Sequence, residues 1–152
     1  MIFIALLILI GGIGYGIVES ENIKKEIREK LRAMTLEEVG NYIIQHNTGT
    51  LKIDMITKIK DIHLVGNTLE FPFYVNNGFL KKISTKLVGG SESHKKLIQK
   101  DTLEENCTKS AFKIFLEKGG VIHYTYRLLK NGKETFLFDF NNTNKMCPKN
   151  TF

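Results

Sequence analysis

The stretch from 121 to 140, VIHYTYRLLKNGKETFLFDF, decides the fold of this chain of 152 residues. Its two apolar runs alternate with a period of two, which is typical of strands that bury one face. Asn131-Gly132 stands between the runs and is a strong signal for a hairpin turn. The stretch therefore predicts a β-hairpin with one aromatic face, to which the first strand contributes Ile122, Tyr124 and Tyr126.

The length of the hairpin loop decides which side chains face the core. A two-residue loop would pair Tyr126 with Leu137 and turn the phenylalanines to the other face, because a shift by one residue exchanges the faces of a strand. A three-residue loop, 130–132, pairs Tyr126 with Phe136 and leaves its glycine in the left-handed position of a bulge. We therefore predict the three-residue loop and a structural core of five aromatic side chains: Tyr124, Tyr126, Phe136, Phe138 and Phe140.

A second hairpin is predicted upstream, around Gly66-Asn67. Glycine at the first loop position suits a two-residue turn, and this loop places Leu64 opposite Leu69 on one apolar face. Pro72 in the second strand has no N–H to donate. That strand is therefore predicted at a sheet edge, or with the proline nitrogen directed away from any neighbour.

Helices are predicted before and between the hairpins. Residues 93–118 carry an apolar stripe, end at Gly119-Gly120 and would cover the aromatic face. Thr35 to Glu38 has the Thr-x-x-Glu form of a capping box, which predicts a new helix there, with one long uninterrupted helix as the alternative. The fold class is thus α+β, with an N-terminal membrane helix and an antiparallel sheet of two β-hairpins, four to five strands in all, packed by helices on one face.

The N-terminal segment 2–18 contains no charged residue and just reaches the length needed to cross a bilayer. A transmembrane anchor is favoured over a cleaved signal peptide because no basic residue precedes the apolar run. Basic residues directly after the run favour a cytoplasmic body, whereas the two cysteines favour an exported one. The predicted organisation is an anchor or signal segment at 1–18, a helical stalk or linker at 19–48, and an α+β domain at 49–152.

The charge composition argues against a nucleic-acid partner. The formal net charge is +6, but only three of the 22 basic residues are arginines, which supply the bidentate contacts to phosphates and bases. Six lysines gather between the hairpins, where they could meet anionic lipid or an acidic partner, or simply form a solvated loop. They are Lys81, Lys82, Lys86, Lys95, Lys96 and Lys100.

Cys107 and Cys147 are the only cysteines of the chain. If the predicted helix covers the last hairpin, the chain after the hairpin can return to it and the two thiols can form a disulfide, with two unrelated thiols as the alternative. Neither cysteine has a second ligand at Cys-x-x-Cys spacing, so no metal or redox site is predicted.

The histidines offer a weaker hint of chemistry. In the predicted register His123 lies opposite Asp139 on the face away from the core, and His63 lies on the corresponding face of the upstream hairpin. A small metal-dependent hydrolase using these three residues is one hypothesis, and an exposed cross-strand charge pair is the simpler interpretation. No phosphate loop, nucleophile elbow or His-Glu-x-x-His motif is present, so no catalytic residue and no cofactor is assigned.

Two segments resemble a group of small bacterial envelope proteins of unassigned function. ENCTKSAFKIFLEKGGVIHYTYRLLKNGKETFLFDFNNTNKMC has their form of Cys, a short helix ending in Leu-x-x-Gly, Tyr-x-Tyr, a glycine turn, an alternating strand and a final Cys. KIDMITKIKDIHLVGNTLEFPFYV is similar to their upstream hairpin. The resemblance implies that Cys107 and Cys147 are paired and that the α+β domain lies outside the cytoplasm.

These observations lead to one main functional hypothesis. The chain would be a membrane-anchored protein of the bacterial inner membrane, held through residues 2–18, with a non-catalytic domain in the periplasm that binds another envelope protein. A secreted periplasmic protein after cleavage and a cytoplasm-facing domain are the alternative locations. A secretion accessory or immunity-type inhibitor is the alternative role, and the metal-dependent hydrolase is the alternative of another class.

Overall fold

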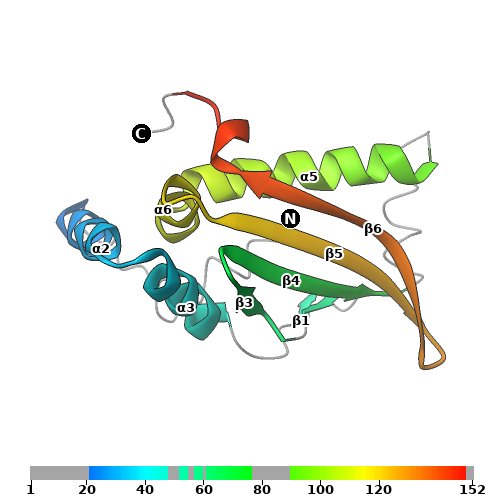
Figure 1. Cartoon of the computed structure of the whole chain (residues 1–152). Coiled ribbons are helices and arrows are strands. Elements are labelled where there is room, and N and C mark those ends of the chain that lie inside the picture. Colours follow the sequence, from blue (N-terminus) through cyan, green and yellow to red (C-terminus); the bar gives the residue numbers. More distant parts are fainter. Residues whose placement is uncertain (1–20, 48–51, 55–56, 60, 77–89, 150–152) are drawn as a thin grey trace.

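The computed structural model describes residues 21–47, 52–54, 57–59, 61–76 and 90–149 (Figure 1). The predicted anchor at 2–18 and the lysines at 81, 82 and 86 lie outside these ranges. Across the ranges that are described, no helix has the length and apolar character needed to cross a membrane.

The sheet is mixed rather than antiparallel. Within the described ranges its strands are β1 (Lys52–Asp54), β2 (Thr57–Ile59), β3 (His63–Val65), β4 (Thr68–Val75), β5 (Val121–Lys130) and β6 (Lys133–Thr143), in the order β1-β2-β4-β5-β6 with β3 also paired to β4. The α+β class is confirmed, but the prediction of an antiparallel sheet was wrong because β4 and β5 pair in parallel. The helices between these two strands return the chain to the same end of the sheet, as a parallel connection requires.

Helices α5 (Gly90–Thr108) and α6 (Ser110–Glu117) form that connection. The sequence predicted one helical stretch here, but Lys109 has an extended backbone and separates the two helices. Figure 1 shows α5 running alongside β6, while α6, α3 and α2 gather toward one end of the strands. Phe71 of β4 contacts Phe112 of α6, so α6 covers the inner face of the sheet.

A capping box separates α2 (Glu21–Ala33) from α3 (Leu36–Asn47), which is the first of the two alternatives that the sequence left open. The Thr35 N–H donates to Glu38 Oε2 at 2.7 Å, and the Glu38 N–H donates to Thr35 Oγ1 at 3.2 Å. Neither helix is an isolated stalk, because Leu31, Val39 and Ile43 belong to the buried core. Helices α2 and α3 both pack against α6.

The β5–β6 turn differs from the three-residue loop predicted from sequence. Lys130 pairs with Lys133, and both Asn131 (φ 52°) and Gly132 (φ 73°) have positive φ, as a two-residue type I′ turn requires. A bulge then restores the aromatic face: Tyr126 pairs with Phe138 while the next residue pairs with Phe136, so that position 137 is extra. The predicted pairing of Tyr126 with Phe136 was wrong because the strand, and not the loop, absorbs the additional residue.

The bulge divides the five predicted core aromatics. Tyr124, Tyr126 and Phe140 are buried and Phe138 is only 8% exposed, whereas Phe136 is 56% exposed. The buried rings form a ladder with the phenylalanines of β4: Tyr126 lies 5.0 Å from Phe73 and 4.8 Å from Phe138 between ring centroids. The prediction that Phe136 is buried was therefore wrong, since Phe136 lies on the turn side of the bulge.

A disulfide joins Cys107 in the last turn of α5 to Cys147, which follows the short 3-10 helix η1 (Asn144–Met146). The predicted disulfide bond is confirmed, and the Cα atoms of the two residues are 5.5 Å apart.

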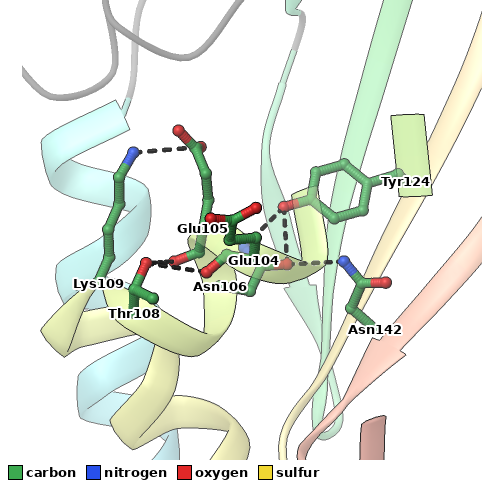
Figure 2. Close-up of polar contacts among 7 residues, drawn as sticks. All are labelled: Glu104, Glu105, Asn106, Thr108, Lys109, Tyr124 and Asn142. Carbon is green, nitrogen blue, oxygen red and sulfur yellow. Dashed lines mark hydrogen bonds and ion pairs between the residues drawn. The ribbon is translucent and has the colours of Figure 1, made fainter. Parts of the chain in front are cut away.

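A buried polar cluster lies next to the disulfide. In Figure 2 the side-chain amide of Asn106, on α5, points at the ring hydroxyl of Tyr124. The distance from Asn106 Nδ2 to this hydroxyl oxygen is 2.9 Å, and Asn142 Nδ2 lies 2.9 Å from Asn106 Oδ1. These hydrogen bonds satisfy the buried hydroxyl of Tyr124 and connect α5 to both strands of the hairpin.

Candidate functional site

The outer sheet face lies opposite the helices and carries the polar side chains that point away from the core. Alternation along β4 directs Glu70, Pro72 and Tyr74 to this face, while Leu69, Phe71 and Phe73 are buried. The parallel pairing places three residues of β5 directly beside them. The pairs are Glu70 with His123, Pro72 with Thr125, and Tyr74 with Arg127.

A cavity of about 400 Å³ opens on this face. We call it the outer-face cavity, and seven residues line it: Asp61, His63, Glu70, Pro72, Tyr74, Thr125 and Arg127. Its volume lies within the range of small-ligand sites in proteins, about 300–1,000 Å³.

The cavity lies beside a break in the pairing of β4. β3 pairs with positions 68–70 and β2 pairs with positions 73–75, so Phe71 and Pro72 have no partner in either strand. Pro72 has no N–H to donate, but no backbone hydrogen bond to β2 or β3 is lost, because neither strand pairs with this position. β4 is an interior strand, so the edge position predicted from Pro72 was wrong. Between β2 and β3 the chain bends through Asp61, whose φ is 51°, a left-handed conformation that aspartate tolerates better than most residues.

At one end of the face, His123 bridges two strands. Its Nδ1 lies 2.5 Å from Glu70 Oε2 and its Nε2 lies 3.0 Å from Asp139 Oδ2. Partial burial disfavours the charged ring, but the hydrogen bonds and charges of Asp139 and Glu70 outweigh it and raise the pKa of His123. The predicted partner Asp139 is thus in contact with His123, although along the ladder His123 pairs with Asn141 and Asp139 pairs with Thr125.

This geometry gives little support to a metal-dependent hydrolase. Each ring nitrogen of His123 faces a carboxylate, so the protonated ring donates from both nitrogens and then has no lone pair for a metal or a substrate proton. His63 is the register partner of Glu70, and its Nδ1 lies 2.8 Å from the backbone oxygen of Asp61. Considering only the residues whose positions are described, no group of three or more His, Cys, Asp or Glu residues is arranged to hold a metal ion.

Arg127 lies at the other end of the cavity and is half-buried. Among the described residues, its guanidinium has no hydrogen bond or ion pair. Tyr74 is its register partner on β4, and the exposed Phe136 is its register partner on β6.

Sequence reasoning did not single out Arg127 or the outward position of Phe136. One signal was available, since Arg127 is the only arginine between 49 and 152. The outward position of Phe136 depends on the bulge in β6, which no pattern in the sequence predicts.

Comparison with known proteins identifies a shared fold. No family model and no curated protein matches the sequence. A solved Pseudomonas aeruginosa protein, inferred to be secreted, matches 80% of this chain and 96% of its own, with a TM-score of 0.56 at 15% sequence identity. The type 2 secretion system pilotin EpsS of Vibrio vulnificus matches 82% of this chain and 98% of its own, with a TM-score of 0.49 at 14% identity. At 15% identity, the first match establishes the fold.

Proposed function

We propose that this chain is a non-catalytic binding protein of the bacterial cell envelope, whose α+β domain holds another envelope protein on its outer sheet face. Residues 2–18 would anchor it in the inner membrane or direct its export, with the domain in the periplasm. The Cys107–Cys147 disulfide supports this location, because disulfides persist in oxidising compartments. The fold shared with a protein inferred to be secreted adds to that support.

The bulge in β6 is the observation that carries the binding role. Without the bulge, the register of a two-residue turn could not bury Phe138 and Phe140 while leaving Phe136 on the outer face. The result is an aromatic ring, 56% exposed, opposite an arginine that lines a cavity. Aromatic and arginine side chains are enriched at the centres of protein interfaces, and bulges often redirect side chains next to functional sites.

The same face argues against catalysis as its role. His123 lies between two carboxylates there, one at each ring nitrogen. A general base needs a free lone pair within reach of a substrate proton, and the protonated ring of His123 has none. A surface that is mixed in charge and partly aromatic is better suited to recognition.

Site-specific crosslinking in intact cell envelope tests this proposal. A photoreactive phenylalanine analogue replaces Phe136 in the full-length chain, and a matched chain carries it at Glu37, an exposed residue of α3. We expect one discrete crosslinked protein from position 136 and none from position 37. The absence of a product at 136, or equal products at both positions, would overturn the proposal.

The identity of the captured protein decides between the narrower roles. A component of a secretion apparatus would make the chain a secretion accessory, and a toxin would make it an immunity-type inhibitor. Mass spectrometry of the crosslinked band distinguishes the two outcomes.

A further inference from the structure

Arg127 is the only lysine or arginine in the lining of the outer-face cavity, among the residues that the structure describes. Its side chain is half-buried, and within the described ranges it forms no hydrogen bond or ion pair. A partly buried charge has lost some of its hydration, so an opposite charge beside it is stabilising. Arg127 is therefore the side chain of this cavity that is best suited to bind an anion.

Two carboxylates near the cavity already have a partner. Glu70 Oε2 faces Nδ1 of His123, and Asp139 Oδ2 faces Nε2 of the same ring. Neither carboxylate forms an ion pair with Arg127. The anion that Arg127 can bind is thus not supplied by these two residues.

Asp61 lies at the middle of the cavity and not at its Arg127 end. The registers of β2 and β3 with β4 place Asp61 beside Pro72, whose partner on β5 is Thr125. Arg127 belongs to the level two residues further along β5, which is about 7 Å away along the strand. Asp61 forms no ion pair with Arg127.

Two aromatic residues flank Arg127 across the sheet. Tyr74 is its register partner on β4, and Phe136 is its register partner on β6. Aromatic neighbours exclude water, so an ion pair between them is screened less than one on an open surface. Phe136, which is 56% exposed, also offers apolar surface to whatever lies beside the anion.

Building on the proposed function, we infer that Arg127 binds the side-chain carboxylate of an aspartate or glutamate in the partner protein, while Phe136 packs against an apolar residue next to it. The planar guanidinium can hold a carboxylate through two parallel hydrogen bonds. A free small carboxylate fits less well, because it would fill the cavity and leave the ring of Phe136 exposed.

The charges around the cavity favour one carboxylate over a polyanion. The cations are Arg127 and the protonated ring of His123. The carboxylates are Asp61, Glu70 and Asp139. Two positive and three negative charges leave a net charge of −1, so a second anionic group beside the first is repelled. Nucleic acid and clustered phosphates therefore do not suit this surface.

NMR of the arginine side chains provides the readout, because the chain contains only three arginines. The full-length chain, labelled with nitrogen-15 and held in detergent, should give one Nε–Hε signal for each of them. The variant Arg127→Lys identifies the Arg127 signal by its loss. The probes are N-acetyl-Phe-Glu-amide and N-acetyl-Phe-Gln-amide, which have nearly the same shape and differ in the carboxylate.

We expect the glutamate peptide to shift the Arg127 signal, and the glutamine peptide to bind at least about tenfold more weakly. Arg28 and Arg32 lie on α2, outside the cavity, and their signals should not move. Equal shifts of all three arginine signals, or no shift with either peptide, would overturn the inference.

Three further probes test the kind of anion. Acetate carries a carboxylate without an apolar neighbour, N-acetyl-Phe-Gln with a free carboxyl terminus carries it at the chain end, and tripolyphosphate represents a polyanion. At equal concentration, each should shift the Arg127 signal less than the glutamate peptide does. A larger shift with any of them would assign the site to that other class of ligand and overturn the inference.

Crosslinking relates the site to the partner in the envelope. In the chain with the photoreactive analogue at position 136, Arg127→Gln should lower the yield of the crosslinked product at least about tenfold. Lys130→Gln, at the exposed tip of the hairpin, is the matched control and should leave the yield unchanged. An unchanged yield with Arg127→Gln would overturn this inference and leave the proposed function standing. Failure of the parent chain to crosslink would overturn the proposed function, while the NMR titration would still decide on the carboxylate site.

Discussion

His123 shows how three strands combine their charges at a single side chain. β5 supplies the imidazole, β4 supplies Glu70 and β6 supplies Asp139. The sequence predicted that His123 and Asp139 share the outer face, because alternation alone places them there. From sequence, a contact with Glu70 was conceivable only if the two hairpins were neighbours, because that contact depends on the parallel pairing of β4 with β5. No local sequence pattern predicts a contact between two strands that become neighbours only through a helical crossover.

The raised pKa of His123 predicts a pH-dependent contribution to stability. Because its folded-state pKa lies above its unfolded value of about 6.5, the stabilisation is complete below pH 6.5 and is lost as the pH rises through the folded pKa. We therefore expect the melting temperature of wild type to exceed that of His123→Gln by more at pH 6 than at pH 9. Asn141→Gln, altering the register partner of His123, is the control. A difference between wild type and His123→Gln that is constant with pH would contradict the bridge.

At the scale of elements, the β5–β6 hairpin shows what a pattern can and cannot determine. The sequence contained a conflict between a two-residue Asn-Gly turn and the burial of alternate phenylalanines, and that conflict is real. A longer loop and a bulge both resolve it. The structure uses the bulge, which keeps the favoured turn and removes one ring, Phe136, from the core. Nothing in the local sequence distinguishes these solutions, because each shifts the pairing by one residue, the first in the loop and the second within β6.

The bulge predicts opposite consequences for two phenylalanines that are two positions apart. Phe138→Ala removes a buried ring stacked on Tyr126 and should lower the free energy of unfolding by about 3–5 kcal/mol. Phe136→Ala removes an exposed ring and should cost less than about 1 kcal/mol. Urea denaturation of both variants beside wild type measures the difference. Similar losses for the two variants would indicate the three-residue loop and a buried Phe136.

The whole molecule is a sheet covered on its inner face by α5 and α6, with α2 and α3 packed on α6. The class of fold was predictable because hairpin and capping patterns are local. The sheet order was not, because it depends on where the helical crossover returns the chain. The functional site was predictable only in part. The outer-face histidines and Asp139 follow from alternation, whereas the cavity and the place of Arg127 in its lining depend on the break in the pairing of β4 and on the parallel crossover.

The disulfide is the one covalent link between the helical crossover and the end of the chain, among the residues described. It joins residues separated by 40 positions and so encloses α6 and the whole β5–β6 hairpin. Closing a loop of this size restricts the unfolded chain and contributes about 3–4 kcal/mol in the chain-entropy model.

The double variant Cys107→Ala with Cys147→Ala should therefore melt about 10 °C below oxidised wild type. Adding a reductant during denaturation should bring wild type close to the variant and leave the variant unchanged. If the disulfide did not contribute to stability, the reductant would not change the melting temperature of wild type. A pronounced loss would mean that the domain depends on oxidation for its stability, as expected of a domain that folds outside the cytoplasm, where this bond can form and persist.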